Sequence, residues 1–293
     1  MFAGTHTALV TPLSDNGIVD TEAFRNLIDK QFDNGIKGVV PMGTTGESAT
    51  LSTEEHRTVI ELTAKQAGGR GLVIAGTGSN CTREAIDLTQ GAELAGADAA
   101  LLVTPYYNKP SQEGLFQHYR AISESTKLPL ILYSIPGRCH ISIEIETMVR
   151  LRNECPNIRA IKEAGGVTER VRQLRAALGD DFEILSGDDA LTVDFMKEGA
   201  VGVISVASNL IPKVMADLTG AMLEDRVGDA ERLHNQYGSL FEAFLKLDTN
   251  PVPIKAALGL TGECNSRLRL PMVEMTDDKV AELKATLESL NIL

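Results

Sequence analysis

The sequence contains no apolar run approaching about 18 residues, and it has no excess of basic residues. Because a helix needs a run of about that length to cross a membrane, we expect no membrane-spanning segment. The 40 acidic residues outnumber the 28 basic residues, and the formal net charge is −12. Such a charge repels the phosphates of nucleic acid. We therefore expect neither a membrane nor a nucleic acid as a partner.

The sequence also lacks the cysteine and histidine patterns of zinc sites. None of its four cysteines belongs to a C-x-x-C pair, and no histidine stands at a zinc-ligand spacing from one. Residues 1–10 show no basic region followed by a long apolar stretch, so we expect no signal peptide. These absences predict a cytoplasmic protein with reduced thiols and no metal cofactor. The spacing of the cysteines and histidines does not exclude a metal site built from histidines and glutamates far apart in the sequence.

Short apolar runs alternate with helical patterns along most of the 293 residues. The chain is 43% hydrophobic and 23% charged, which is ordinary for a globular protein. The runs are almost continuously apolar, as parallel strands covered on both faces are. From the second run on, they start roughly every 20 to 35 residues, about the length of one strand–helix unit. We expect eight strands, at residues 6–10, 38–42, 72–76, 99–104, 130–133, 158–162, 183–186 and 202–206.

Helix-start signals follow several of these runs. A hydroxyl residue stands next to acidic residues at Ser52, Thr82, Ser111 and Thr168, as is typical of a helix N-terminus. Eight strands that alternate with helices predict an α/β fold, a (β/α)8 TIM barrel. We expect the catalytic barrel over residues 1–218 and a C-terminal helical region, 219–293, packed on it. The rival, a doubly wound open sheet, usually opens with a glycine-rich fingerprint that is absent after the first strand.

Lys162, at the end of the sixth predicted strand, is the most informative candidate residue. Side chains alternate along a strand, so Lys162 shares the barrel interior with Ala160 while Ile161 faces the helices. Burial of an ammonium lowers its pKa, and a neutral amine can form a Schiff base with a carbonyl compound. The alternative is a lysine paired with a strand-end carboxylate such as Asp188. The spacing alone does not decide between these two interpretations.

Other strand ends carry groups that suit a small carboxylate substrate. The glycine-rich segment 43–48 lacks the lysine of a phosphate-binding loop, but its N–H groups and hydroxyls suit a carboxylate. Tyr133 ends the strand beside that of Lys162 and can carry protons. Arg138 follows a Pro-Gly turn and is a side chain suited to bidentate carboxylate binding. Each of these residues also has an ordinary structural interpretation, as a turn, a buried tyrosine or a surface arginine.

Taken together, the strand-end motifs resemble those of dihydrodipicolinate synthase, a family in the pyruvate-dependent Schiff-base lyase superfamily. The resemblance covers the full chain, and Thr44-Thr45 with Arg138 favours the synthase over sialic acid lyase. The motifs are Gly43-Thr44-Thr45-Gly46-Glu47-Ser48, Thr104-Pro105-Tyr106-Tyr107-Asn108, Tyr133-Ser134-Ile135-Pro136-Gly137-Arg138, Ile161-Lys162-Glu163-Ala164, Ser186-Gly187-Asp188-Asp189, Gly202-Val203-Ile204-Ser205 and Asn250-Pro251-Val252-Pro253-Ile254-Lys255.

The resemblance implies a lyase that condenses pyruvate with L-aspartate 4-semialdehyde to give 4-hydroxy-tetrahydrodipicolinate. This reaction is the first committed step of lysine and diaminopimelate biosynthesis. Lys162 would form the Schiff base with pyruvate, so no separate cofactor or metal is implied. Thr44, Tyr133 and Tyr107 would form a proton relay, with Tyr107 reaching the active site of a neighbouring subunit.

The resemblance also implies a set of substrate-binding residues. Thr45 would hold the pyruvate carboxylate together with backbone N–H groups, and Arg138 would bind the carboxylate of the semialdehyde. Gly187 and Ile204 would shape the pocket.

Members of the family are commonly homotetramers that lysine inhibits at a subunit interface. The resemblance therefore implies a possible lysine effector, with Glu84 facing its α-ammonium group. The ordinary interpretation of His56 and Glu84 is a solvated helix surface. The matching positions of the implied allosteric site are Ser48, Ala49, His56, Asn80, Glu84 and Tyr106.

Two other functions remain open at this stage. One is another pyruvate-linked class I aldolase or dehydratase that acts on a sugar acid. The other is a non-catalytic small-molecule sensor built on the same barrel, which would not need to keep the full set of reactive residues.

Overall fold

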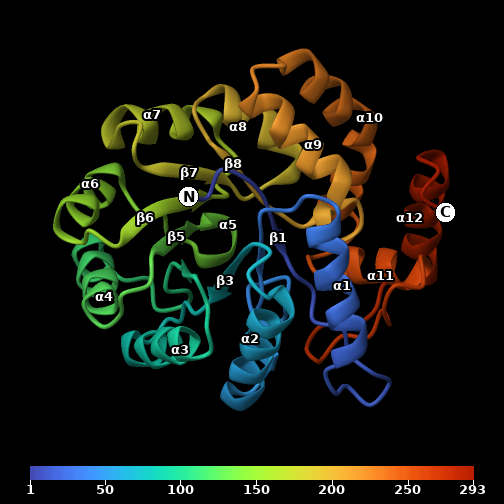
Figure 1. Ribbon diagram of the computed structural model, residues 1–293, viewed down its shortest axis with the longest axis horizontal. Coiled ribbons are helices and arrows are strands. Elements are labelled where there is room, and N and C mark those ends of the chain that lie inside the picture. Colours follow the sequence, from blue (N-terminus) through green and yellow to red (C-terminus); the bar gives the residue numbers. More distant parts are fainter.

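The computed structural model describes residues 1–293 and contains eight parallel strands closed into a barrel (Figure 1). The strands follow one another around the barrel in chain order, and β8 pairs with β1 in parallel to close it. The predicted (β/α)8 barrel is therefore confirmed. The strands are β1 (Gly4–Ala8), β2 (Gly38–Val40), β3 (Leu72–Gly76), β4 (Ala99–Val103), β5 (Leu130–Ser134), β6 (Ile158–Glu163), β7 (Glu183–Ser186) and β8 (Gly202–Ser205).

Helices surround the barrel and cover the outer faces of the strands (Figure 1). Alternate strand residues point outward into this layer, and Ile161 of β6 is buried there among helix residues. A short helix, α5 (Pro136–Cys139), follows β5 at the barrel mouth. The outer helices are α1 (Thr21–Asp33), α2 (Thr53–Ala67), α3 (Thr82–Leu94), α4 (Gln112–Glu124), α6 (Ile145–Glu154), α7 (Thr168–Leu178), α8 (Thr192–Lys197) and α9 (Pro212–Leu223).

The barrel interior is a separate apolar cluster made by the other strand residues. Ala160 of β6 and Tyr133 of β5 belong to this cluster, while Ile161 does not. The alternation that the sequence predicted for β6 is therefore confirmed, and it turns Lys162 toward the interior. The cluster consists of Phe2, Ala8, Val40, Ile74, Ala99, Leu101, Ile131, Tyr133, Ala160, Leu185 and Ile204.

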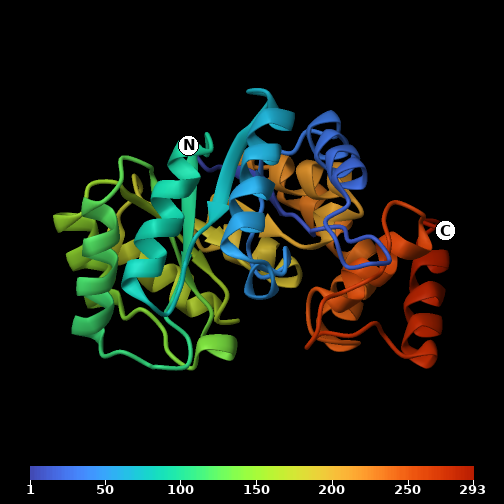
Figure 2. The ribbon, with the colours of Figure 1, turned by 90° about the horizontal axis from the view of Figure 1, so that it is seen from below.

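Three further helices, α10 (Val227–Lys246), α11 (Val252–Leu260) and α12 (Asp277–Ser289), form the C-terminal region. The eighth barrel helix, α9, ends at Leu223, past the expected boundary at residue 218. Barrel residues Val10, Leu27 and Val203 share one buried cluster with residues of α10, α11 and α12. Figure 2 shows the C-terminal helices (orange and red) beside the barrel, extending toward the same side as the short helix α5.

The structure contains no membrane-spanning helix, no disulfide bond and no cluster of metal-binding side chains. No helix combines the length and hydropathy of a membrane-spanning segment. All four cysteines are free thiols. No group of three or more His, Cys, Asp or Glu side chains is placed to hold a metal ion.

Candidate active site

Lys162 and Tyr133 lie side by side at the mouth of the barrel. Their Cα atoms are partners in the β5–β6 register, so both side chains point to the same face of the sheet. Each residue is 6% exposed. The Lys162 Nζ lies 4.3 Å from the centroid of the Tyr133 ring. The amine therefore stands in a nearly dry site against an aromatic ring.

The surroundings of Lys162 shift its protonation equilibrium toward the neutral form. Burial lowers its pKa to about 8, the negative charges of Asp189 and Asp188 oppose this change, and the positive charge of Arg138 adds to it. Lys162 forms no salt bridge, so the ion pair with Asp188 that the sequence left open is not formed. The lysines that do pair with carboxylates are Lys30, Lys197, Lys213, Lys246, Lys255, Lys279 and Lys284.

Gly187, directly after β7, leaves the space that the Lys162 side chain occupies. A Cβ atom at this position would lie 3.0 Å from the Cε of Lys162 and 2.7 Å from the Cβ of Ala164. The Gly187 N–H donates a hydrogen bond of 2.8 Å to the Glu163 carbonyl, which holds the chain close to β6. The requirement for glycine is therefore steric and concerns the lysine directly.

Tyr133 is a neutral phenol in this environment. Burial raises its pKa far above the usual range, while the charge of Arg138 and the side chain of Thr44 oppose the increase. The Tyr133 hydroxyl can therefore pass a proton without existing as a stable phenolate. The structure brings Thr44, Tyr133 and Lys162 together.

Tyr107, the third member of the predicted relay, lies elsewhere on the same chain. Its side chain is 91% exposed, and its φ of 72° is in the left-handed region that favours glycine. Within one chain, this tyrosine stands on the surface of the β4–α4 loop. It acts on Lys162 only if it belongs to the site of another subunit, as the resemblance implies.

The turn after β2 presents unpaired backbone donors. The N–H groups of Gly46 and Glu47 donate to the carbonyls of Gly43 and Thr44, over 3.1 Å each. The N–H groups of Thr44 and Thr45 have no acceptor in the structure. The free N–H groups of Thr44 and Thr45, together with the two threonine hydroxyls, suit an anion such as a carboxylate.

Arg138, in helix α5, is an exposed cation without an acidic partner. Its Nη2 donates a hydrogen bond of 2.9 Å to the Asn250 carbonyl, and the residue forms no salt bridge. Its remaining guanidinium donors are available for a carboxylate at the mouth of the barrel. Ile204, by contrast, is 1% exposed and belongs to the interior cluster with Tyr133.

The residues of the implied lysine site lie in the segments after β2, β3 and β4, with His56 in α2 and Glu84 in α3. His56 is buried, its Nε2 lies 2.8 Å from the Gly76 carbonyl oxygen, and burial lowers its pKa. Glu84 is exposed and accepts a hydrogen bond from the Ser79 hydroxyl. Tyr106 is 41% exposed.

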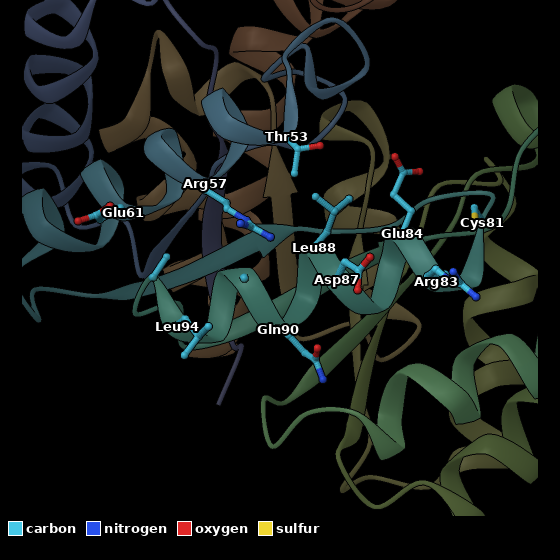
Figure 3. A pocket seen from close by; sticks show the side chains of 12 residues that line it. Thr53, Arg57, Glu61, Cys81, Arg83, Glu84, Asp87, Leu88, Gln90 and Leu94 are labelled. Atoms are coloured by element: carbon cyan, nitrogen blue, oxygen red, sulfur yellow. The ribbon is translucent and has the colours of Figure 1, made fainter.

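Only Glu84 among the six implied residues lines the groove between α2 and α3. Figure 3 shows this groove, with Glu84 and Cys81 toward one end and Glu61 and Leu94 toward the other.

Two residues of the C-terminal region contact this site, and sequence reasoning named them only within a motif and gave them no role. The Asn250 Nδ2 donates a hydrogen bond of 3.0 Å to the Thr45 hydroxyl. Lys255 is fully buried and pairs with Glu47 in the turn after β2. One signal was visible in the sequence, because Lys255 is the only charged residue in the otherwise apolar segment of α11.

Comparison with known proteins places these features in a family. The profile of the dihydrodipicolinate synthetase family matches residues 1–290. A 4-hydroxy-tetrahydrodipicolinate synthase of Citrifermentans bemidjiense is 46% identical over 293 residues, which is 100% of both chains.

Two solved structures are similar over the whole fold. A chloride-inhibited dihydrodipicolinate synthase of Acinetobacter baumannii, complexed with pyruvate, has a TM-score of 0.97 at 42% identity and covers 100% of both chains. A dihydrodipicolinate synthase of Cyanidioschyzon merolae with lysine bound has a TM-score of 0.96 at 39% identity, covering 100% of this chain and 99% of the other.

Proposed function

Since this chain belongs to the dihydrodipicolinate synthetase family, we propose that it condenses pyruvate with L-aspartate 4-semialdehyde to give 4-hydroxy-tetrahydrodipicolinate. Relatives named for this activity align with this chain over its full length. The observation that supports it most directly is the buried Lys162 amine, which has a lowered pKa and no carboxylate partner. Such an amine is a nucleophile for the keto group of pyruvate.

The proposed chemistry begins with attack of the Lys162 Nζ on the keto carbon of pyruvate. Water leaves and an imine forms, and loss of a methyl proton then converts it to an enamine. The enamine carbon bonds to the aldehyde carbon of the semialdehyde, whose oxygen takes up a proton. The semialdehyde amino group then attacks the imine carbon, so the ring closes and Lys162 is released. One water is lost overall, and neither a metal nor a separate cofactor is required.

We assign the proton transfers to Tyr133 and Thr44, with Tyr107 supplied by a neighbouring subunit. Tyr133 lies against the amine and is protonated in its dry site. We assign the pyruvate carboxylate to the Thr45 hydroxyl and the free N–H groups of Thr44 and Thr45. A carboxylate held there would also balance a positive iminium on Lys162.

We assign the carboxylate of the semialdehyde to Arg138, whose guanidinium has no acidic partner. Gly187 gives Lys162 its space, and Ile204 closes the pocket from β8. Asp188 and Asp189 remain unpaired with Lys162, and their charges keep its pKa from falling further.

Reduction with borohydride in the presence of pyruvate, followed by mass spectrometry, tests the first step. We expect one pyruvate-derived adduct on Lys162 and none in the Lys162→Ala variant. Absence of the adduct from the wild-type chain would eliminate this function. Turnover with aspartate semialdehyde, compared with sialic acid and keto-deoxy sugar acids, then identifies the second substrate. Preference for a sugar acid would assign the chain to another pyruvate-linked aldolase or dehydratase.

We further propose a cytoplasmic homotetramer that lysine inhibits. The exposure of Tyr106 and Tyr107 suits a surface that another copy covers. The lysine-bound Cyanidioschyzon structure shows that a relative binds this effector. We assign the effector to Ser48, Ala49, His56, Asn80, Glu84 and Tyr106. The turnover assay with added lysine tests the inhibition, and analytical ultracentrifugation tests the assembly.

A further inference from the structure

Lys255 forms a buried ion pair whose position is unusual for a merely stabilising contact. Its side chain is 0% exposed and that of Glu47 is 3% exposed. The Lys255 Nζ donates hydrogen bonds to Glu47 Oε1 over 2.6 Å and to the Thr11 carbonyl over 3.0 Å. Because desolvation of two charges offsets much of their attraction, a buried pair is often no more stabilising than apolar residues of similar size. This pair therefore calls for a reason beyond stability.

Glu47 belongs to the turn that carries Thr44 and Thr45. Its φ is 57° and its ψ is 35°, the left-handed conformation that residues other than glycine rarely adopt. Such a conformation persists only where the surroundings fix it. Both carboxylate oxygens of Glu47 are held by the C-terminal region, Oε1 by Lys255 and Oε2 by the Arg269 N–H over 3.1 Å.

The same C-terminal segment also touches the turn through Asn250. Its Nδ2 donates to the Thr45 hydroxyl oxygen, which leaves the Thr45 proton free to donate toward a substrate. Its carbonyl accepts from Arg138. Thr11, which Lys255 binds, in turn donates from its hydroxyl to the Gly46 carbonyl over 2.7 Å. The contacts of Lys255 and Asn250 thus converge on residues 45–47.

We propose that Lys255 is a positioning residue, which acts through Glu47 to hold the 43–48 turn with the N–H groups of Thr44 and Thr45 open to pyruvate. This inference rests on the proposed function. It makes the C-terminal region a part of the pyruvate site, although no residue of that region forms a hydrogen bond or salt bridge with Lys162. It assigns Lys255 an effect on pyruvate binding that a role in stability alone would not produce.

The test uses three variants and the full chain. Lys255→Met leaves the Glu47 charge buried without a partner. The double variant Lys255→Met/Glu47→Gln removes both charges and keeps an acceptor for Arg269. Lys30→Met is the matched control, because Lys30 also ties the barrel to the C-terminal region, through Glu263, but forms no hydrogen bond to the turn. The measurements are the pyruvate concentration that gives half-maximal borohydride trapping, the KM for the semialdehyde and the thermal unfolding midpoint.

Lys255→Met should have the lowest thermal unfolding midpoint. The midpoint of the double variant should lie between those of Lys255→Met and the wild type. Both variants should need about tenfold more pyruvate for half-maximal trapping, equivalent to ~1.4 kcal/mol, with the semialdehyde KM changed by less than about twofold. Lys30→Met should lose stability without any change in the pyruvate requirement.

Two results would overturn the inference. One is a folded double variant with the pyruvate requirement of the wild type. The other is failure of the double variant to fold, which would show that the pair serves folding. Failure of the wild-type chain to trap pyruvate would instead refute the proposed function, so the two failures are distinguishable.

Discussion

The lowered pKa of Lys162 makes adduct formation depend on pH in a defined direction. Below a pKa of about 8, the neutral amine is the minor form, and its fraction rises about tenfold for each pH unit. We therefore expect the rate of pyruvate adduct formation to increase with pH and to level off above about pH 8. Single-turnover trapping between about pH 6 and pH 9 measures this profile. A rate that keeps rising toward the ordinary lysine pKa would contradict the dry environment described for this amine.

Gly187 gives a second prediction about the same amine. In Gly187→Ala, the new Cβ would stand 2.7 Å from Ala164 Cβ and 3.0 Å from Lys162 Cε, so the turn and the lysine must both shift. Because a small displacement of a reacting group slows its reaction strongly, we expect adduct formation to fall at least about tenfold. Gly238→Ala, where an added Cβ would meet nothing within 4 Å, is the control. Equal trapping rates in the two variants would show that Gly187 does not set the lysine position.

Arg138 tests the assignment of the second substrate. Arg138→Ala removes an exposed guanidinium that has no acidic partner, and its only hydrogen bond beyond α5 is to the Asn250 carbonyl. We expect the KM for the semialdehyde to rise by about 10- to 100-fold, as loss of a charge-assisted carboxylate contact implies. Pyruvate trapping should change far less. Steady-state kinetics with each substrate varied in turn measures both effects, and an equal loss for both would refute this role.

For single residues, the sequence predicted positions within one strand or turn, but it did not predict contacts between segments far apart in the chain. The period-two alternation of β6 placed Lys162 in the barrel, because Ile161 suits the helix layer and Ala160 the interior. The contact between Asn250 and Thr45 joins residues 205 positions apart. No local pattern encodes such a contact, and it follows from how α11 docks on the barrel.

The strands were predictable as elements because parallel strands covered on both faces are continuously apolar. The bounds of β3 and β7 agree with the prediction, and the other six strands differ from it by one or two residues at one or both ends. β1 spans Gly4–Ala8 instead of 6–10, because Gly4 and Gly202 approach closely enough that a Cβ on Gly202 would lie 2.0 Å from the Gly4 carbonyl oxygen. Val10 leaves the ladder because its N–H donates to the Asn209 side chain.

The helix-start predictions divide in the same way. Ser52 forms a capping box with Glu55, and Ser111 accepts from the Gly114 N–H, so both are confirmed as caps. Thr82 and Thr168 also mark the starts of their helices, but each is the first helical residue and neither helix has a side-chain cap. The Thr82 hydroxyl lies 2.9 Å from His118 Nδ1. A tertiary contact has replaced the local one.

These caps yield a prediction about stability. Ser52→Ala removes the acceptor for the Glu55 N–H at the start of α2, and we expect a loss of about 1 kcal/mol in the free energy of unfolding. Thr168→Ala, in which the hydroxyl makes no capping bond, should change it by less than about 0.5 kcal/mol. Urea denaturation of both variants measures the difference. Equal losses would mean that the capping box does not stabilise α2.

On the scale of the whole molecule, the C-terminal region and the barrel share one buried cluster. Val10, Leu27 and Val203 pack with Phe241, in α10, and with other residues of that region. The amphipathic pattern of residues 219–293 and the absence of a flexible linker indicated this packing from the sequence. What the sequence did not reveal is that the shared surface also carries Lys255 and Asn250 to the turn after β2.

The exposed Tyr107 leads to a prediction about the assembled protein. A side chain that is 91% exposed, on a backbone at a φ of 72°, is held in that form most readily when a second subunit covers it. If each active site combines its own Lys162 with Tyr107 of a neighbour, subunits carrying Lys162→Ala and Tyr107→Phe should complement each other. In a hybrid pair, one site contains both wild-type residues and the other contains neither.

Random mixing makes about half of the pairs hybrid, so about a quarter of all sites are complete. Mixed subunits should therefore regain about a quarter of the wild-type activity, although each parent variant is nearly inactive. Co-expression with two affinity tags isolates the hybrids for assay. Hybrids no more active than the parents would place Tyr107 outside the active site or within its own subunit.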